Sequence, residues 1–407
     1  MEDNSFEKKA RAYALKNAIA YKGNANQGAV ISALFNEGLE KDKVKEVAPK
    51  ISEIIKEINS LSLEEQKKEF ELLKEEVSER ETREGLPEIP NTENGVYTRI
   101  APSPSGGMHV GHALTASISY LYFKKYGGKF YVRIEDTNPE NILPEAYELL
   151  KQDSEWLFEG NAEIIIQSER MKIYYDYAKK LIKKGYAFVC TCSSEDFKKY
   201  VDKKKDCPCK KIGVDEQIER WNKMLLKNSE NNFKQGEAIL RFASDMNNPN
   251  PAMRGFPLAR INETSHPIQK NKYRVWPLMN LAVAIDDIEF GMTHIIRAKD
   301  HRDNAKRQEM IFKALDKQDK IPWTAFLGRW HIKGLKLSAS QISRDIKEGK
   351  YSGWDDSKLP TLQALKHKYK PLAFHRFAEN RGLSEVDKTI DSKEFFRLLD
   401  YFYKEEK

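Results

Sequence analysis

The sequence predicts an α/β protein whose core is a doubly wound parallel sheet, with helical segments before and after it. The first observation is a block of strand candidates at 96–100, 129–134 and 163–167 that alternate with helices at about 111–125, 140–157 and 169–184. The second is a strand at 293–298 and a helix at about 301–315, which resume the pattern after an irregular section. Such alternation is typical of βαβ units with right-handed crossovers.

The part of the chain before these strands has the pattern of helices alone. Residues 5–80 contain no strand-like run, and Ser62 and Glu65 form a capping-box signature at the start of one helix. Apolar residues follow at helical spacing up to Val77. The segment from Glu81 to Gly95 is rich in Glu, Pro, Asn and Gly, which predicts a linker.

The loop between the first strand and its helix is the most informative stretch. Residues 99–112 read Arg-Ile-Ala-Pro-Ser-Pro-Ser-Gly-Gly-Met-His-Val-Gly-His. A Gly/Pro-rich loop before a helix directs backbone N–H groups and the helix dipole at an anion, usually a phosphate. His109 and His112 can each donate a hydrogen bond to a phosphate oxygen, and Gly111 lets a nucleotide approach the backbone. Since Gly-Lys-Ser/Thr and Gly-x-Gly-x-x-Gly are both absent, this is neither a Walker loop nor a dinucleotide fingerprint.

All four cysteines lie at the start of the irregular section, which runs from about 190 to 270. They form two Cys-x-Cys pairs, Cys190 with Cys192 and Cys207 with Cys209. Two such pairs can close a tetrahedral thiolate site around a metal, and reduced cysteines without a metal are the alternative. The clustering argues against a secreted disulfide framework. The section is most simply explained as a domain inserted into one sheet.

The composition narrows the class of protein further. Lys and Arg outnumber Asp and Glu by 69 to 62, and this net charge of +7 permits nucleic-acid binding without requiring it. The most apolar stretch, Leu278 to Ile285, is far too short to span a bilayer. The N-terminus is charged and lacks the apolar region of a signal peptide. We therefore expect no membrane association and a cytoplasmic location.

A second loop, residues 334–340, reads Gly-Leu-Lys-Leu-Ser-Ala-Ser and precedes a mostly helical tail that starts at about 331. Alone it is a weak signal, because small polar loops with one lysine are common. Together with the histidine loop it gains meaning. A mobile loop carrying Lys336, Ser338 and Ser340 could close over the leaving phosphates of a bound nucleotide.

The two loops resemble the two signature sequences of class I aminoacyl-tRNA synthetases. Further segments resemble the glutamyl branch: Arg99-Ile-Ala-Pro-Ser103, Arg133-Ile-Glu-Asp-Thr-Asn138, Trp276-Pro-Leu-Met-Asn280, Ile285-Asp-Asp287 and Ile296-Arg-Ala-Lys-Asp300. The N-terminal helical segment and the run Gly349-Lys-Tyr-Ser-Gly-Trp-Asp-Asp356 are similar to archaeal glutamyl-tRNA synthetases. The resemblance covers nearly the whole chain in order.

The resemblance implies a Rossmann-like catalytic core that uses ATP and Mg²⁺ to ligate L-glutamate to tRNA(Glu). Glutamyl-adenylate forms first, and the terminal ribose of the tRNA then takes the glutamyl group. Because the attacking carboxylate is already a nucleophile, the first step needs orientation and charge stabilisation but no general base. The inserted domain would contact the acceptor stem. Some members hold zinc there, so the resemblance implies a structural Zn²⁺ on the four cysteines.

The family's functional positions fall on particular residues of this chain. The implied catalytic residues are His109, His112 and Lys336. The implied ATP-binding residues are Gly111, Asp300, Ser338 and Ser340. The implied glutamate-binding residues are Arg99, Ala101, Ser103, Glu135, Met279 and Arg297. A guanidinium suits a substrate carboxylate because it can bind both oxygens, and Glu135 would bind the amino group.

The implied domain order has five parts. Residues 1–90 are the N-terminal helical segment with its linker, and residues 91–189 and 271–330 are the two halves of the catalytic core. Residues 190–270 are the inserted acceptor-binding domain, and residues 331–407 are the second signature loop with a helical stem-contact region.

Three positions depart from the family pattern. Ala339 stands where a second signature lysine is usual, and Lys333, Lys336 or Arg344 could supply the missing cation. Met279 stands where a substrate-contacting tyrosine is usual, which bears on strict glutamate selectivity. Asn138 replaces the usual aspartate.

The family also continues into a C-terminal β-barrel that reads the anticodon, and no strand-rich segment remains here before Lys407. Three explanations stay open: a truncated chain, a separate anticodon-binding chain, and an enzyme that does not read the anticodon. Two other functions also stay open. One is a shortened paralogue resembling the glutamyl-queuosine tRNA(Asp) synthetases, which the N-terminal helices argue against. The other is a tRNA-binding module with weakened catalysis, which the intact histidine pair and both arginines argue against.

Overall fold

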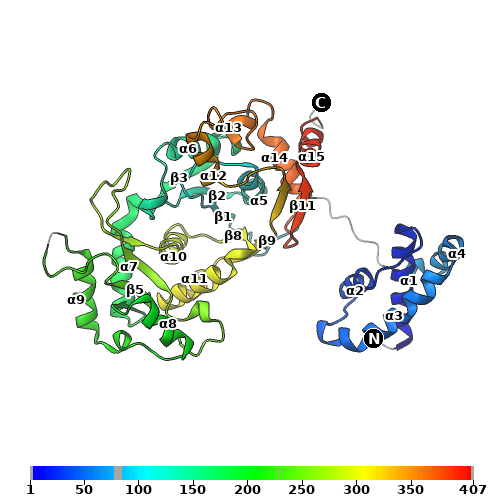
Figure 1. The fold of residues 1–407 in the computed structure, drawn as a ribbon, viewed down its shortest axis with the longest axis horizontal. Coiled ribbons are helices and arrows are strands. Elements are labelled where there is room, and N and C mark those ends of the chain that lie inside the picture. Colours follow the sequence, from blue (N-terminus) through cyan, green and yellow to red (C-terminus); the bar gives the residue numbers. More distant parts are fainter. Residues whose placement is uncertain (1–2, 78–84, 228, 405–407) are drawn as a thin grey trace. The chain divides into compact units, whose positions relative to one another are not determined.

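The structure is a computed structural model that describes residues 3–77, 85–227 and 229–404. The chain divides into two compact units, Met1–Arg83 and Glu84–Lys407, each with its own apolar core (Figure 1). The five-part domain division made from the sequence stays a prediction. No helix in the described part of the chain is both long and apolar enough to cross a membrane.

The N-terminal unit is all helical, as its sequence pattern predicts. Its helices are α1 (Asp3–Ala20), α2 (Gln27–Asn36), α3 (Val44–Ser60) and α4 (Leu63–Leu73), with short 3-10 turns η1 (Lys41–Lys43) and η2 (Lys74–Glu76). The predicted capping box is present, because Ser62 Oγ accepts from the Glu65 N–H and the Glu65 carboxylate accepts from the Ser62 N–H. Of the predicted linker, residues 81–84 lie outside the described residues, and residues 85–95 form a loop.

The core of the second unit contains the predicted parallel strands. Strands β1 (Val96–Ile100), β2 (Gly128–Ile134) and β3 (Ala162–Ile166) form one parallel sheet in that order, and β8 (His294–Ala298) pairs in parallel with β9 (Trp323–Leu327). The two sheets meet where the Thr293 N–H donates to the Tyr97 carbonyl at 2.9 Å. Gly128 is required at the start of β2, since a Cβ there would lie 2.4 Å from the Val96 carbonyl oxygen.

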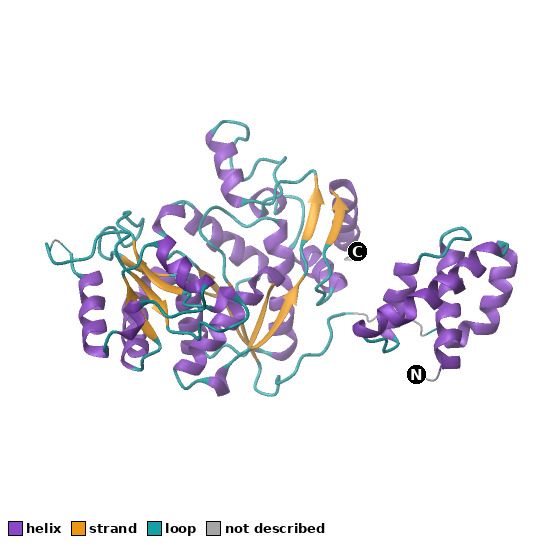
Figure 2. Ribbon diagram, turned by 60° about the horizontal axis from the view of Figure 1, so that its bottom comes forward, coloured by secondary structure: helices purple, strands orange, loops and turns teal. Residues whose placement is uncertain are grey.

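Helices connect and cover these strands (Figure 2). They are α5 (Val110–Tyr126), α6 (Ala146–Leu157), α7 (Met171–Lys183), α10 (Met279–Glu289) and α11 (Arg302–Ala314). The sequence pattern predicted every one of these helices except α10. Helix α6 starts later than expected, after the 3-10 turn η3 (Pro139–Asn141). Other short 3-10 turns are η4 (Gln167–Arg170), η5 (Pro208–Lys211), η6 (Pro251–Met253), η7 (Lys299–His301) and η8 (Gln318–Lys320).

The section expected to be irregular contains an antiparallel sheet. Its strands, in sheet order, are β4 (Ala187–Cys190), β5 (Ile239–Phe242), β6 (Pro257–Ile261) and β7 (Val275–Pro277). Helices α8 (Ser194–Asp202) and α9 (Val214–Leu225) lie between β4 and β5 in the sequence. The strands are short and their connections are long, so alternation of apolar and polar residues gives little signal over any one of them.

The tail from residue 331 is mostly helical, as expected, but it holds one strand pair that was not predicted. Its helices are α12 (Ala339–Lys347), α13 (Leu362–Leu365), α14 (Pro371–Arg381) and α15 (Ser392–Lys404). Strand β10 (Trp330–Lys333) pairs in parallel with β11 (Lys388–Asp391), beside α14 and α15 (Figure 1). The partner strand comes more than fifty positions later, so local sequence patterns do not reveal the pair.

Candidate active site

A cavity of about 320 Å³ opens where the carboxyl ends of the parallel strands meet the N-terminus of α5. This edge is where doubly wound sheets bind ligands. Of the site residues predicted from the sequence, the following line it: Arg99, Ala101, Ser103, Gly111, His112, Glu135, Met279 and Arg297. The structure therefore brings together the six predicted glutamate-binding positions and the start of the histidine helix. These residues come from strands, loops and helices far apart in the sequence.

The two signature histidines stack face to face at the start of α5, with ring centroids 3.9 Å apart and an angle of 17° between the planes. His109 Nδ1 accepts from the Gly111 N–H at 3.1 Å, and His112 Nδ1 accepts from the His109 N–H at 3.4 Å. Burial lowers the pKa of His112 to about 4, and burial together with the neighbouring ring lowers the pKa of His109 well below its usual value. Both rings are therefore neutral, and because each Nδ1 is an acceptor, each Nε2 carries the hydrogen.

The loop that carries the histidines is held by residues far along the chain. The Met108 N–H donates to Asp153 Oδ2 at 2.7 Å, and Gln363 Nε2 donates to the other oxygen of Asp153 at 2.8 Å. The backbone on either side of His109 pairs with the segment around Thr361: the Val110 N–H donates to the Pro360 carbonyl and the Leu362 N–H to the Met108 carbonyl. Hydrogen bonds to the Asp153 carboxylate and to the backbone of residues 360–362 therefore hold this loop in place.

Trp354 packs directly on the same loop. A Cβ added at Gly106, where φ is +155°, would lie 2.1 Å from the Trp354 ring, so no other residue fits without moving that side chain. The indole belongs to a small apolar cluster that includes Leu143, Ile342 and Ala339. Ala339, the position where the family usually has a lysine, is therefore buried against apolar side chains in this chain.

Buried ion pairs support one wall of the cavity. Asp287 on α10 accepts from Arg99 Nε at 3.1 Å and Nη2 at 2.9 Å, and from Arg133 Nη1 at 2.7 Å. Arg133 also contacts Glu135 at 3.3 Å. The two guanidinium groups hold the pKa of the Asp287 carboxyl well below its usual value against the opposing effect of burial. Within the described part of the chain Arg99 Nη1 makes no hydrogen bond and remains able to donate to a ligand.

Glu135 and Arg297 both line the cavity, and the pKa of each is shifted in the direction that disfavours its charged form. Burial raises the pKa of Glu135, although Arg133 and Arg99 oppose the shift. Burial and the charge of Arg99 lower the pKa of Arg297 to about 9. Arg297 Nη1 donates to Gln308 Oε1 at 2.9 Å, and within the described residues no carboxylate lies within salt-bridge distance of its guanidinium.

Among the described residues, neither the second signature loop, residues 334–340, nor Asp300 lines the cavity. Lys336 Nζ donates to Asp345 Oδ2 at 3.0 Å, and Lys350 Nζ donates to the other oxygen of the same carboxylate at 2.9 Å. Ser338 caps α12, and its hydroxyl lies 3.2 Å from that of Ser340. Asp300 pairs with Arg329 at the surface. The Leu337 side chain nevertheless comes close to Gly111, which places the loop beside the histidine pair.

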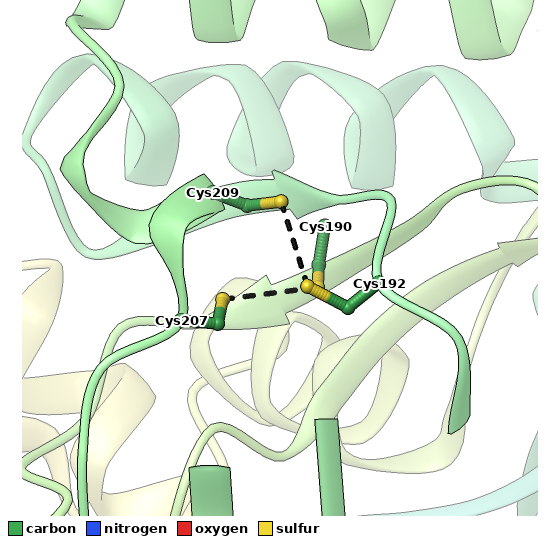
Figure 3. Close-up of side chains that lie close together, drawn as sticks. All are labelled: Cys190, Cys192, Cys207 and Cys209. Atoms are coloured by element: carbon green, nitrogen blue, oxygen red, sulfur yellow. Dashed lines mark hydrogen bonds between the residues drawn. The ribbon is translucent and has the colours of Figure 1, made fainter. Parts of the chain in front are cut away.

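The four cysteines converge on one point at the end of β4 (Figure 3). Their sulfur atoms all lie within 4.8 Å of one another, with Cys190 to Cys207 at 3.9 Å and Cys192 to Cys209 at 3.8 Å. Zinc–sulfur bonds of about 2.3 Å in a tetrahedron require sulfur atoms about 3.8 Å apart. The donor set therefore fits a closed tetrahedral metal site.

Several residues of the site were not predicted from the sequence. His301 and Gln308 line the cavity, and Asp287 holds Arg99 although only its motif was noted. Helical periodicity offers a signal for Gln308, since it lies on α11 about two turns after His301, which ends the 3-10 turn η7 just before that helix. Asp153 and Asp345 lack such a signal, because their importance comes from tertiary hydrogen bonds.

The sequence matches the family model described as the catalytic domain of class I tRNA synthetases (E and Q) over residues 95–399. It is 41% identical over 383 residues to the glutamate–tRNA ligase of Methanocaldococcus jannaschii, covering 94% of this chain and 68% of that protein. It is 44% identical over 389 residues to the glutamate–tRNA ligase of Thermococcus kodakarensis, covering 93% and 67%. A crystal structure of a glutamate tRNA ligase from Elizabethkingia meningosepticum aligns with a TM-score of 0.49 at 19% identity, covering 76% of this chain and 69% of that one.

The matched residues, 95–399, include the parallel sheet, the residues that line the cavity and the loop with His109 and His112. The predicted α/β class and parallel core are confirmed. The chain belongs to the class I tRNA synthetases of the E and Q group.

Proposed function

We propose that this protein is a glutamate–tRNA ligase that forms glutamyl-adenylate from L-glutamate and ATP and transfers the glutamyl group to tRNA(Glu). Two curated relatives above 40% identity carry that name. The observation that supports it in this chain is the cavity wall, where Arg297 lacks a carboxylate partner among the described residues and Arg99 keeps one amino group unbonded. A cavity with this wall suits a small substrate that brings its own carboxylate.

The first step is an in-line displacement at the α-phosphorus of ATP. An oxygen of the glutamate α-carboxylate forms the new bond, and pyrophosphate leaves with the electron pair of the broken P–O bond. In the second step a hydroxyl of the terminal ribose attacks the carbonyl carbon of the mixed anhydride, loses its proton, and AMP leaves. When bound, Mg²⁺ neutralises charge on the phosphates. The protein orients the reactants and stabilises the charge that spreads onto phosphate oxygens.

The histidines would act as neutral hydrogen-bond donors in this scheme. Because both Nδ1 atoms accept backbone N–H groups, each ring carries an Nε2–H donor. His112 and Gly111 line the cavity, whereas His109 is buried and would donate to a phosphate that approaches the start of α5. A neutral donor keeps its proton throughout, so the step does not depend on histidine titration near pH 7. Lys336 would add the cation once it exchanges Asp345 for a phosphate. Asp300, Ser338 and Ser340 stay proposed ATP contacts.

Glutamate would bind between the two arginines and the Glu135 carboxylate in the cavity. Arg297 and Arg99 would bind carboxylate oxygens, and the Glu135 carboxylate would accept from the substrate ammonium group. Ala101 and Ser103 follow β1 beside Arg99 and would shape the pocket there. Met279, a residue that is 37% exposed, would contact the substrate through its thioether where the family usually has a tyrosine.

Glutamate-dependent exchange of pyrophosphate into ATP, with and without tRNA(Glu), tests this proposal. We expect exchange that requires tRNA, as the family resemblance implies. Exchange without tRNA would favour the glutamyl-queuosine-type alternative, and no exchange under either condition would favour the binding-module alternative and contradict the proposal. His112→Ala is the matched variant, because losing one transition-state donor should lower the rate about a hundredfold.

We also propose a structural Zn²⁺ held by Cys190, Cys192, Cys207 and Cys209. The sulfur separations support it, and four thiolate ligands leave no open coordination position for chemistry. Metal analysis of freshly purified, reduced protein should give one zinc per chain, and Cys207→Ser should lose the metal and lower the melting temperature. Protein without stoichiometric zinc would contradict this assignment.

The partner proposed for the inserted section is the tRNA acceptor stem. Residues 190–270 carry many lysines, which suits phosphate contacts. Crosslinking of tRNA(Glu) to this section would support the assignment, and crosslinks confined to other parts of the chain would contradict it. The separate anticodon-binding chain and the cytoplasmic location stay predictions from the sequence.

A further inference from the structure

Gln308 lies beside Arg297 on the cavity wall and links three elements of the cavity. Its side chain is 5% exposed on α11. Its Oε1 accepts from Arg297 Nη1 on β8 at 2.9 Å, and its Nε2 donates to Asn280 Oδ1 on α10 at 3.4 Å. A guanidinium can only donate, so the amide oxygen must be the atom that faces Arg297. The orientation of the Gln308 amide is therefore determined by Arg297.

The electrostatics of Arg297 differ from those of the other arginines around it. Arg99 and Arg133 are both paired with Asp287, and Arg170 is paired with Asp286. In the described structure Arg297 is held by a neutral amide instead of a carboxylate. Asp287 and Glu135 act on the Arg297 guanidinium only from beyond salt-bridge distance, and its lowered pKa reflects burial and the charges of Arg99 and Arg133. A carboxylate in direct contact is what a ligand can supply.

We propose that Gln308 is a positioning and specificity-determining residue for the substrate carboxylate. Its amide oxygen fixes the Arg297 guanidinium toward the cavity, and because the amide is neutral, Arg297 has no carboxylate in direct contact until the substrate binds. A carboxylate at position 308 would hold Arg297 equally well but would neutralise it. The amide at this position, in place of an acid, therefore keeps the site selective for a substrate that brings a carboxylate to Arg297. This inference rests on the proposed function.

Gln308→Glu tests the charge and Gln308→Met tests the hydrogen bond, since both side chains are close to glutamine in size. The assay is steady-state aminoacylation of tRNA(Glu), with KM measured separately for glutamate and ATP. We expect Gln308→Glu to raise the glutamate KM about a hundredfold because an internal ion pair competes with the substrate. We expect Gln308→Met to raise it about tenfold through loss of the bond that orients Arg297. The ATP KM should stay within twofold of wild type in both.

Gln318→Glu is the matched control, because it makes the same chemical change on the exposed turn that follows α11. It should leave both KM values unchanged. A packing role for Gln308 would instead lower the melting temperature in both variants and leave the ratio of the two KM values unchanged. If Gln308→Glu does not fold, Gln308→Met decides the question by that ratio.

The outcomes separate this inference from the proposed function. Wild-type protein that ligates no glutamate contradicts the function itself. Wild-type activity combined with a glutamate KM less than twofold higher in the folded variants overturns the role of Gln308 alone. An equal rise in the glutamate and ATP KM values overturns it as well, because the effect would then not be specific to the carboxylate.

Discussion

Replacing Asp287 by asparagine removes one negative charge from beneath the cavity with almost no change of shape. The Asp287 carboxylate is 2% exposed in the ion pair and accepts from two arginines at 2.7–3.1 Å. Asparagine cannot neutralise either guanidinium, and its amide group would point N–H donors at one of them. Breaking a buried pair in this way costs about 3–5 kcal/mol. Typical domain stabilities are about 5–15 kcal/mol, so the loss is a large share of the total.

Urea denaturation followed by circular dichroism measures this effect, with Asp319→Asn as the exposed control. The control should lie within about 0.5 kcal/mol of wild type. The pH dependence gives a second check. The pKa of Asp287 is lowered in the folded state from 3.8, so its stabilisation is present above about pH 4 and is lost as the pH falls further. The difference in free energy of unfolding between wild type and Asp287→Asn should therefore become smaller below about pH 4. Equal unfolding free energies at pH 7 would refute the reasoning.

Three further predictions concern the loops around the cavity. Burial raises the pKa of Asp153 to about 7, so the group favours the folded state below about pH 4 and loses that contribution as the pH rises to 7; urea titrations should show this slope weakened in Asp153→Asn. Gly106→Ala forces a Cβ against Trp354, so we expect about 1–3 kcal/mol of destabilisation and slower pyrophosphate exchange, partly restored by adding Trp354→Phe; unchanged melting and exchange would contradict this. Lys336→Ala should lower exchange about a hundredfold with little change in melting temperature, whereas exposed Lys347→Ala should not.

The sequence predicts the parts of this protein in which chemistry is encoded locally. The strand at Val96–Ile100, the glycine-rich loop and the helix from Val110 follow one another without interruption, so their order alone predicts a phosphate-binding turn. The capping box at Ser62 is equally local. The four cysteines could be grouped from the sequence because the members of each pair are two positions apart, and the segment between the pairs, which contains α8, needs only to bring the pairs together.

The parts that escaped prediction depend on contacts between distant segments. Asp287 matters because it lies under Arg99, and Gln308 because it lies beside Arg297. An aspartate or a glutamine in the sequence does not by itself indicate a functional site, since buried carboxylates and amides serve many structural roles. The short strands of the antiparallel sheet are hard to predict for the same reason, because each is stabilised more by the strands that pair with it than by its own residues.

The pairing of the histidine loop with the segment around Thr361 has a consequence for synthesis of the chain. Asp153 and Gln363, which fix this loop together, are 210 positions apart. At about 5–20 residues per second, a ribosome needs roughly 10–40 s to cover that distance. The first parallel strands and their helices can form during this interval, but the loop then lacks the partners on Pro360 and Leu362. A nascent chain that ended before Pro360 would carry all six proposed glutamate contacts, and we expect it to activate no glutamate.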